Sequence, residues 1–257
     1  MKTSFKSLLK SDRRFIGTMM QLPSEELVEI MGHAGVEYLV MDMEHCPMSH
    51  AKILSMIRAA ESAGVVPMVR VPDVYDEDSI KKALDCGASG LVVPNVSTAE
   101  QARLVVQYAK YAPVGKRGAC PYVRANAFGS NDTVAYYQKA NEETALVLLV
   151  EGPEGVSNLP EIMRVEGIDA VNIGAVDLSV HLGIPGQTNH PKVMDAIKQA
   201  GKLAKENGKV IGVFCHKAED ASIAKDWEGV GFYFCPIPEM VLYEEYKRIL
   251  VTMKELG

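Results

Sequence analysis

The chain has 257 residues, of which 47% are hydrophobic and 23% are charged, as is typical of a folded globular protein. This length suits a single large α/β barrel as well as two small domains. The formal net charge of -6 argues against nucleic-acid binding, because proteins that bind nucleic acids concentrate Lys and Arg against the phosphates. We therefore expect small-molecule partners.

The cysteines and the apolar segments indicate in which cellular compartment the protein is expected. Five cysteines are scattered along the chain without a CxxC pair, which favours reduced thiols over disulfides or a zinc site. The N-terminal stretch has no long apolar core, and no window of 18 apolar residues follows. The sequence therefore predicts neither a signal peptide nor a membrane span, and we expect a cytoplasmic protein.

Short β-rich runs alternate with amphipathic stretches along the chain. The predicted strands are Phe15–Met20, Glu37–Asp42, Val65–Arg70, Gly90–Pro94, Ala145–Glu151, Ala170–Gly174, Val210–Phe214 and Gly231–Cys235. Apolar residues at helical spacing predict helices within Ser24–Ala34, Ser49–Ala63, Asp78–Asp85, Ala99–Tyr111, Pro191–Asn207, Ala218–Asp226 and Glu239–Leu256. Each strand is nearly all apolar, as expected of a parallel sheet that is covered on both faces. The alternation predicts one (β/α)8 TIM barrel over residues 1–257, with a doubly wound open sheet as the alternative.

One long irregular stretch, Ala112–Asn131, interrupts the alternation. Loops of this length inside compact domains are commonly functional. Its basic residues Lys116 and Arg117 would attract an anionic substrate if the loop lay near the barrel mouth. Alternatively, both side chains are simply solvated.

Polar and charged residues gather where the predicted strands end. They are Gln21, Asp42, Glu44, His45, Arg70, Glu151, Asp177 and His216. In barrels of this kind, the loops that follow the strands carry the chemistry. Carboxylates can hold a divalent cation, and a guanidinium can hold a substrate oxygen. The pattern predicts an active site for an anionic substrate and a metal ion.

Each of these residues also has a structural interpretation. His45 would be an ordinary packed or solvated histidine, Arg70 one half of an ion pair, and Asp177 the N-cap of a helix, a role compatible with function. Glu151 follows the apolar run "ALVLLV", where a carboxylate without a partner would be costly to bury. A functional role is therefore favoured for Glu151.

The motifs together resemble those of the HpcH/HpaI aldolase family, the metal-dependent class II pyruvate aldolases. They are, in order, "SFKSLLK", "DMEHCP", "PMVRVP", "IKKALDCGASGLVVPNV", "PVGKRG", "VEGPEGVSNLPEI", "VEGIDAVNIGAVDLS" and "LGIPGQTNHPKV". They span nearly the whole chain, and their order is more specific than any one motif. The resemblance implies a barrel of the phosphoenolpyruvate/pyruvate type and a homohexamer in which C-terminal helices are exchanged between subunits.

The resemblance also implies roles for the reacting groups. His45 is similar to the family's catalytic base, and Arg70 is similar to the residue that stabilises the developing enolate. Asp85, in "ALDCG", matches the carboxylate that raises the basicity of the histidine. Glu151 and Asp177 resemble the protein ligands of the divalent ion.

The substrate site is implied in the same way. The backbone amides around Val176 and Asp177, preceded by Gly174, match the site that receives the substrate carboxylate. The implied reaction cleaves a 4-hydroxy-2-oxo acid to pyruvate and an aldehyde through a metal-stabilised pyruvate enolate. The expected ion is Mg²⁺ or Mn²⁺, with Co²⁺ as a further option, because a site of two carboxylates suits hard cations.

Two positions depart from the family pattern. Leu149 stands where members commonly carry Gln, and "GAVDLS" with Val176 replaces the common "GPADLS" or "GPSDLS". We interpret both as altered substrate choice. The alternatives are an oxaloacetate decarboxylase or related oxo-acid lyase, and a metal- or carboxylate-binding homologue without turnover. A CoA-dependent lyase is weaker, because the sequence has no clear nucleotide-binding feature.

Overall fold

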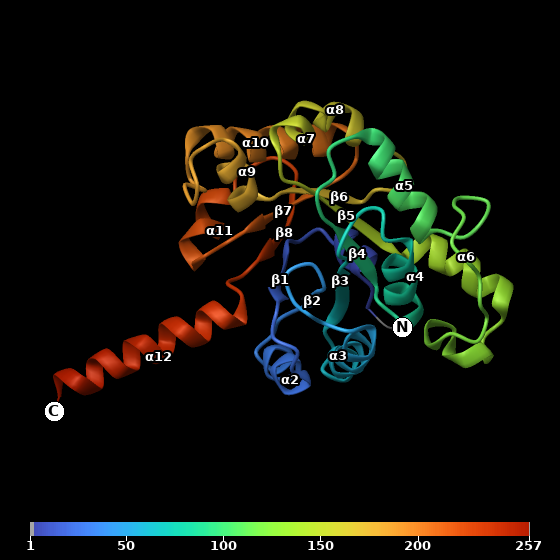
Figure 1. The fold of residues 1–257 in the computed structure, drawn as a ribbon, viewed down its shortest axis with the longest axis horizontal. Helices are drawn as coiled ribbons and strands as arrows, with labels where there is room; N and C mark the ends of the chain where they lie inside the picture. The colour runs from blue at the N-terminus through green and yellow to red at the C-terminus, as the bar shows by residue number, and fades with distance from the viewer. Residues whose placement is uncertain (1–2, 257) are drawn as a thin grey trace.

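Eight parallel strands form one sheet that curls into a barrel in this computed structural model, which describes residues 3–256 (Figure 1). The strands are β1 (Phe15–Met20), β2 (Tyr38–Asp42), β3 (Val66–Arg70), β4 (Gly90–Val93), β5 (Ala145–Val150), β6 (Ala170–Ile173), β7 (Ile211–Phe214) and β8 (Val230–Phe234). Their order is β6-β5-β4-β3-β2-β1-β8-β7. The predicted TIM barrel is confirmed, and every strand boundary lies within one residue of its prediction.

The barrel closes between β6 and β7 through few backbone contacts, and we call this junction the seam. The described residues form a single parallel bridge there, between Ala170 and Val210. Next to it, the side chain of Asn172 in β6 accepts the backbone N–H of Gly212 in β7, at 2.6 Å. A side chain thus completes a contact that a ladder hydrogen bond makes elsewhere in the sheet.

The helices surround the barrel. They are α1 (Phe5–Leu9), α2 (Glu25–His33), α3 (His50–Ser62), α4 (Glu77–Cys86), α5 (Ala99–Ala109), the 3-10 helix η1 (Arg124–Gly129), α6 (Thr133–Glu143), α7 (Pro153–Ser157), α8 (Leu159–Ile162), α9 (Ala175–His181), α10 (Pro191–Glu206), α11 (Ala218–Ala224) and α12 (Pro238–Glu255). All seven predicted helices are present. The short α1, α7, α8 and α9 offer too few turns for a periodic pattern, and α6 buries no side chain.

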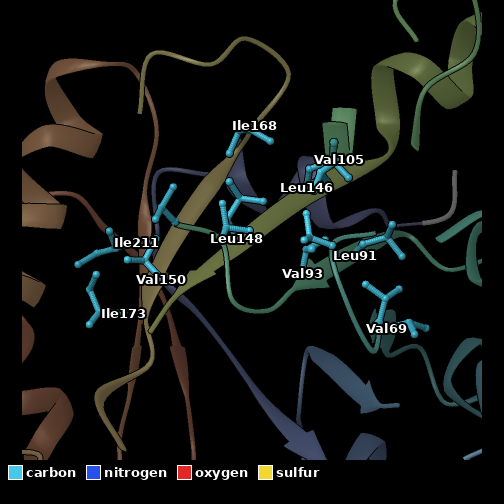
Figure 2. Close-up of a cluster of buried hydrophobic side chains, with 14 of the residues drawn as sticks. Val69, Leu91, Val93, Val105, Leu146, Leu148, Val150, Ile168, Ile173 and Ile211 are labelled. Atoms are coloured by element: carbon cyan, nitrogen blue, oxygen red, sulfur yellow. The ribbon is translucent and has the colours of Figure 1, made fainter. Parts of the chain in front are cut away.

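Two apolar layers hold this architecture together. Outward-facing strand residues such as Leu91 and Leu148 pack against helix residues such as Val105 of α5 (Figure 2). Inward-facing residues, including Val40 and Met68, fill the barrel. Alternation between the two layers explains why each strand is apolar along its whole length.

The α1 helix closes the barrel at the rim where the strands begin. The Phe5 ring meets those of Phe15, Tyr38 and Phe232 edge-on, at centroid distances of 5.2 to 5.3 Å. All four side chains are buried. The opposite rim, where the strands end, is therefore the one available for a site.

The long connection Ala112–Asn131 lies on the closed rim, because it leaves the C-terminal end of α5 and leads into β5. Within it, Arg124 donates to Glu61 of α3 and to the carbonyl of Cys86 at the end of α4. Both contacts are on the side where the strands start. Within one chain, the loop and its basic pair therefore do not lie near the barrel mouth, and Arg117 is buried rather than solvated.

The α12 helix leaves the barrel and projects outward (Figure 1). Only Pro238 of this helix is buried. At its start, Glu239 accepts the backbone N–H groups of Gln21 and Leu22, at 2.7 and 2.6 Å, which anchors the departing chain to the end of β1. Among residues 3–256, no helix combines the length and the apolar character needed to cross a membrane.

Candidate active site

A buried ion pair lies at the ends of β2 and β3. Asp42 and Arg70 are neighbours in strand register, and Arg70 Nε and Nη2 donate to Asp42 Oδ1 and Oδ2, at 2.8 and 2.6 Å. Gln21 at the end of β1 also donates to Asp42, at 3.0 Å. Burial raises the pKa of Asp42, but the hydrogen bonds and charge of Arg70 outweigh it and hold that pKa below its usual range. The pair fixes the orientation of the guanidinium.

The turn after β2 places Glu44 and His45 beside this pair. Asp42 Oδ1 accepts the backbone N–H of Glu44 at 2.9 Å, which orders the turn. Glu44 Oε2 lies 2.9 Å from Arg70 Nη1 and 3.8 Å from His45 Nε2. Burial raises the pKa of Glu44, although the charges of Arg70 and His45 oppose it. The side chain of His45 is 57% exposed, so its imidazole is accessible to a substrate.

Glu151 directly follows β5 and is 5% exposed. Its Oε2 accepts the backbone N–H of Asn95, just beyond β4, at 2.6 Å. Asn95 Nδ2 also donates to Glu44 Oε1, at 3.2 Å. Burial raises the pKa of Glu151, the Asn95 N–H lowers it, and the charges of Glu44 and Asp177 raise it further, so that it lies above its usual value. Asn95 thus links the Glu44 and Glu151 carboxylates at the open rim.

Gly174, at the end of β6, makes room for the Glu151 carboxylate. A Cβ at this position would lie 2.5 Å from Glu151 Cγ and 2.8 Å from Oε1. Gly174 is also the N-cap of α9, so the prediction that Asp177 caps this helix is wrong. Asp177 is the third residue of α9, and it is exposed together with Val176.

Asp85 lies apart from these residues. It is near the end of α4, which leads into β4, so it lies at the closed rim. Its Oδ1 accepts a hydrogen bond from Arg117 Nη2 at 2.5 Å, and the buried Arg117 guanidinium lies over the Tyr111 ring. Within one chain, the structure does not bring Asp85 to His45.

Two carboxylates at the open rim are candidate ligands for a divalent ion. Among residues 3–256, no group of three or more His, Cys, Asp or Glu side chains has the geometry of a metal site. Glu151 and Asp177 nevertheless both follow strand ends at this rim, and Gly174 leaves the room that the Glu151 carboxylate occupies. Two carboxylates, with other positions left to water and substrate, form a donor set that suits Mg²⁺ or Mn²⁺.

Sequence reasoning assigned no individual role to several residues that shape this site. Asp42, Glu44 and Gln21 had a signal, since each lies at or just beyond a strand end. Asn95 had none, because "PNV" after a strand is typical of an ordinary turn. His216, the remaining polar strand-end residue, donates its backbone N–H to Asp220 on the following helix.

Comparisons with known proteins identify relatives of this chain. The 4-hydroxy-2-oxo-heptane-1,7-dioate aldolase of Escherichia coli is 36% identical over 237 residues, covering 92% of this chain and 88% of that protein. The hydroxypyruvate/pyruvate aldolase of Sagittula stellata is 36% identical over 212 residues, covering 82% and 83%.

Two solved structures match along almost the whole chain. The HpcH/HpaI aldolase of Desulfitobacterium hafniense has a TM-score of 0.93 at 31% identity, and citrate synthase SbnG has a TM-score of 0.90 at 30% identity. Each match covers 99% of this chain and 98% of the other. The family model HpcH/HpaI aldolase/citrate lyase matches residues 16–228. The chain belongs to the HpcH/HpaI aldolase/citrate lyase family, and an aldolase function fits it.

Proposed function

We propose that this protein is a class II pyruvate aldolase that cleaves a 4-hydroxy-2-oxo acid to pyruvate and an aldehyde. The observation that carries the proposal is a guanidinium at the open rim that Asp42 fixes 2.9 Å from Glu44. Asn95 links Glu44 to Glu151, one of the two proposed metal ligands. The E. coli and S. stellata relatives are named for aldolase activities, which supports this reaction class.

Substrate binding follows from the charges at the rim. A divalent ion held by Glu151 and Asp177, Mg²⁺ or Mn²⁺ with Co²⁺ as a further option, would withdraw electron density from the carboxylate and 2-oxo group of the substrate. The amides around Val176 and Asp177, after Gly174, are proposed to receive the substrate carboxylate. Arg70 contributes a positive charge whose direction is set before the substrate binds.

Proton transfer is assigned to His45. Its imidazole takes the proton from the 4-hydroxyl as the C3–C4 bond breaks and the aldehyde is released. The electron pair of that bond passes to the 2-oxo group and forms the pyruvate enolate, whose charge Arg70 stabilises. Protonation at C3 then yields pyruvate. Each of these groups lies at a strand end or on the loop or helix that follows it.

An assembly of several subunits belongs to the same proposal. The apolar side chains of α12 are exposed, as expected of a helix exchanged between subunits of a homohexamer. Because Asp85 lies at the closed rim, any pairing between Asp85 and His45 has to be made between neighbouring subunits. We place this enzyme in the cytoplasm.

Formation of a citrate-type product is the second candidate. It is favoured by the similarity to citrate synthase SbnG, which covers nearly all of both chains. The two candidates differ in direction and co-substrate, because one releases pyruvate from a hydroxy-oxo acid and the other joins two carbon units. Oxaloacetate decarboxylation is a third activity that the same ion and arginine could support.

One set of assays separates these functions. EDTA-treated protein is incubated with a panel of 4-hydroxy-2-oxo acids, with oxaloacetate, and with oxaloacetate plus acetyl-CoA, each with and without Mn²⁺. We expect Mn²⁺-dependent release of pyruvate and an aldehyde. Metal-dependent deuterium incorporation into the pyruvate methyl group, followed by NMR, requires no knowledge of the aldehyde. Full activity in EDTA would contradict the metal assignment.

A further inference from the structure

Asn95 contacts two carboxylates of the site through two different N–H groups. Its backbone N–H binds Glu151 Oε2, and its side chain Nδ2 binds Glu44 Oε1. Each contact uses one oxygen of its carboxylate, and Asn95 does not bind the second oxygen. The second oxygen of Glu151 lies beside Gly174. The second oxygen of Glu44, although close to Arg70, has no hydrogen-bond partner among residues 3–256.

The backbone of Asn95 explains how one residue reaches both groups. Its φ is 57°, in the left-handed region that few residues other than Gly, Asn and Asp adopt easily. The next residue, Val96, donates its backbone N–H to the carbonyl of Leu149 at 3.0 Å and ties the turn to β5. The turn is thus held against the strand that carries Glu151.

We propose that Asn95 is a positioning residue of the reaction centre. It sets the spacing and orientation of Glu44 and Glu151, so that one oxygen of Glu151 is available to the divalent ion and one oxygen of Glu44 stays against the Arg70 guanidinium. This inference rests on the proposed function. It assigns the two effects to different atoms, since the backbone N–H acts on Glu151 and the side-chain amide acts on Glu44.

Two substitutions separate these atoms. Asn95→Gly keeps the left-handed backbone and its N–H but removes the contact to Glu44. Asn95→Ala also removes that contact, and it disfavours the left-handed backbone on which the Glu151 contact depends. Asn207→Gly, at the end of α10 on the closed rim, is the matched control. Thermal unfolding of each variant checks that it is folded.

Mn²⁺ binding to the EDTA-treated proteins is measured by the electron paramagnetic resonance of the free ion. Partners that orient metal ligands typically contribute about 10- to 100-fold in affinity or activity. We expect Asn95→Gly to bind Mn²⁺ within about twofold of wild type, whereas Asn95→Ala loses about tenfold in affinity or more. Asn207→Gly should match wild type.

The side-chain contact is tested by deuterium exchange into pyruvate. We expect exchange in Asn95→Gly to fall about tenfold, with little further loss when Asn95→Gly is added to Glu44→Gln, because the two residues act as one unit. Wild-type exchange in Asn95→Gly, or losses that simply add, would overturn the inference even if Asn95→Ala fails to fold. A wild-type protein that neither binds Mn²⁺ nor catalyses exchange would instead overturn the proposed function.

Discussion

Arg70 shows how a side chain is prepared for its task before the substrate arrives. Two of its three nitrogens are bound to Asp42, and the third faces Glu44. A guanidinium held in this way cannot turn to follow its ligand. Its charge is therefore fixed in place, which is the efficient arrangement for stabilising charge that develops only during a reaction.

Substitution of Arg70 should consequently affect chemistry more than binding. We expect Arg70→Ala to abolish deuterium exchange into pyruvate, and Arg70→Lys to remain about 100- to 1,000-fold impaired, because an ammonium cannot reproduce the planar fork. Exchange is followed by NMR in the presence of Mn²⁺. Arg103→Ala, which removes an exposed arginine on α5, serves as the control. Retained exchange in Arg70→Ala would show that Arg70 is only a structural residue.

Burial of the Glu151 carboxylate lowers the stability of the folded protein when no metal ion is bound. Its folded-state pKa is raised, so the ionised carboxylate is less stable in the folded protein than in the unfolded chain. The protonated Glu151 carboxyl contributes its full stabilisation below the unfolded-state pKa. This contribution is lost as the pH rises through the folded-state pKa.

We therefore expect Glu151→Gln to raise the free energy of unfolding of EDTA-treated protein at pH 7, because burial disfavours the ionised carboxylate of the folded protein. The gain should shrink at about pH 3.5, which is below the unfolded-state pKa of about 4.3. Urea denaturation at the two pH values measures it. The exposed Glu154→Gln should give no such difference, and an equal gain at both pH values would contradict this explanation.

The residues that could be recognised from sequence share one property. Arg70 and Glu151 lie at strand ends, where position alone indicates the open rim. Asn95 acts through a backbone N–H and a left-handed φ, which a sequence does not display. The partner of Asp85 is Arg117, 32 residues away, and only the folded chain shows that both lie at the closed rim.

At the scale of elements, the strands were predictable because burial on both faces leaves each one apolar along its whole length. Helix boundaries followed wherever one face was buried. The α6 helix escaped prediction because it buries no side chain. The α9 helix was indicated only through Asp177 as its N-cap, because its seven residues make barely two turns and show no periodic pattern. The site depends on this short helix, since α9 carries Asp177.

The junction between β6 and α9 offers a direct test of the metal site. Gly174 has a φ of -75°, which any residue can adopt, so a side chain there is excluded only by Glu151. We expect Gly174→Ala to displace the Glu151 carboxylate and to weaken Mn²⁺ binding about 10- to 100-fold while the protein stays folded. Titration of the apoprotein with Mn²⁺ measures this. Gly152→Ala is the control, because a Cβ there would meet no atom within 4 Å.

For the whole molecule, α12 is the element that a single chain does not explain. Its 18 residues project from the barrel, with Tyr243, Tyr246, Leu250 and Met253 each more than half exposed. Most helical stability in proteins comes from packing of an apolar face. A second subunit would supply the packing that this helix lacks.

A chain that ends at Val241 should therefore lose its assembly without losing its barrel, because Glu239 and its two hydrogen bonds to the end of β1 are kept. We expect light scattering after size exclusion to show a smaller species than the full chain. Urea denaturation should still show a cooperative transition. Glu244→Gln, a single change on the same helix, should leave the mass unchanged, and an unchanged mass of the shortened chain would exclude this role for α12.

The seam between β6 and β7 is the part of the barrel that we expect to open locally. The amide proton of Gly212 is protected by one side-chain oxygen of Asn172, so rotation of that side chain is enough to expose it to solvent. Amides paired within the β2–β3 ladder require the separation of two strands. In hydrogen exchange, Gly212 should consequently lose its proton faster than the amides of β3, with an opening free energy below that of global unfolding. Since Asp177 lies just beyond β6, the proposed metal site would stand beside the line of the sheet that we expect to open most readily.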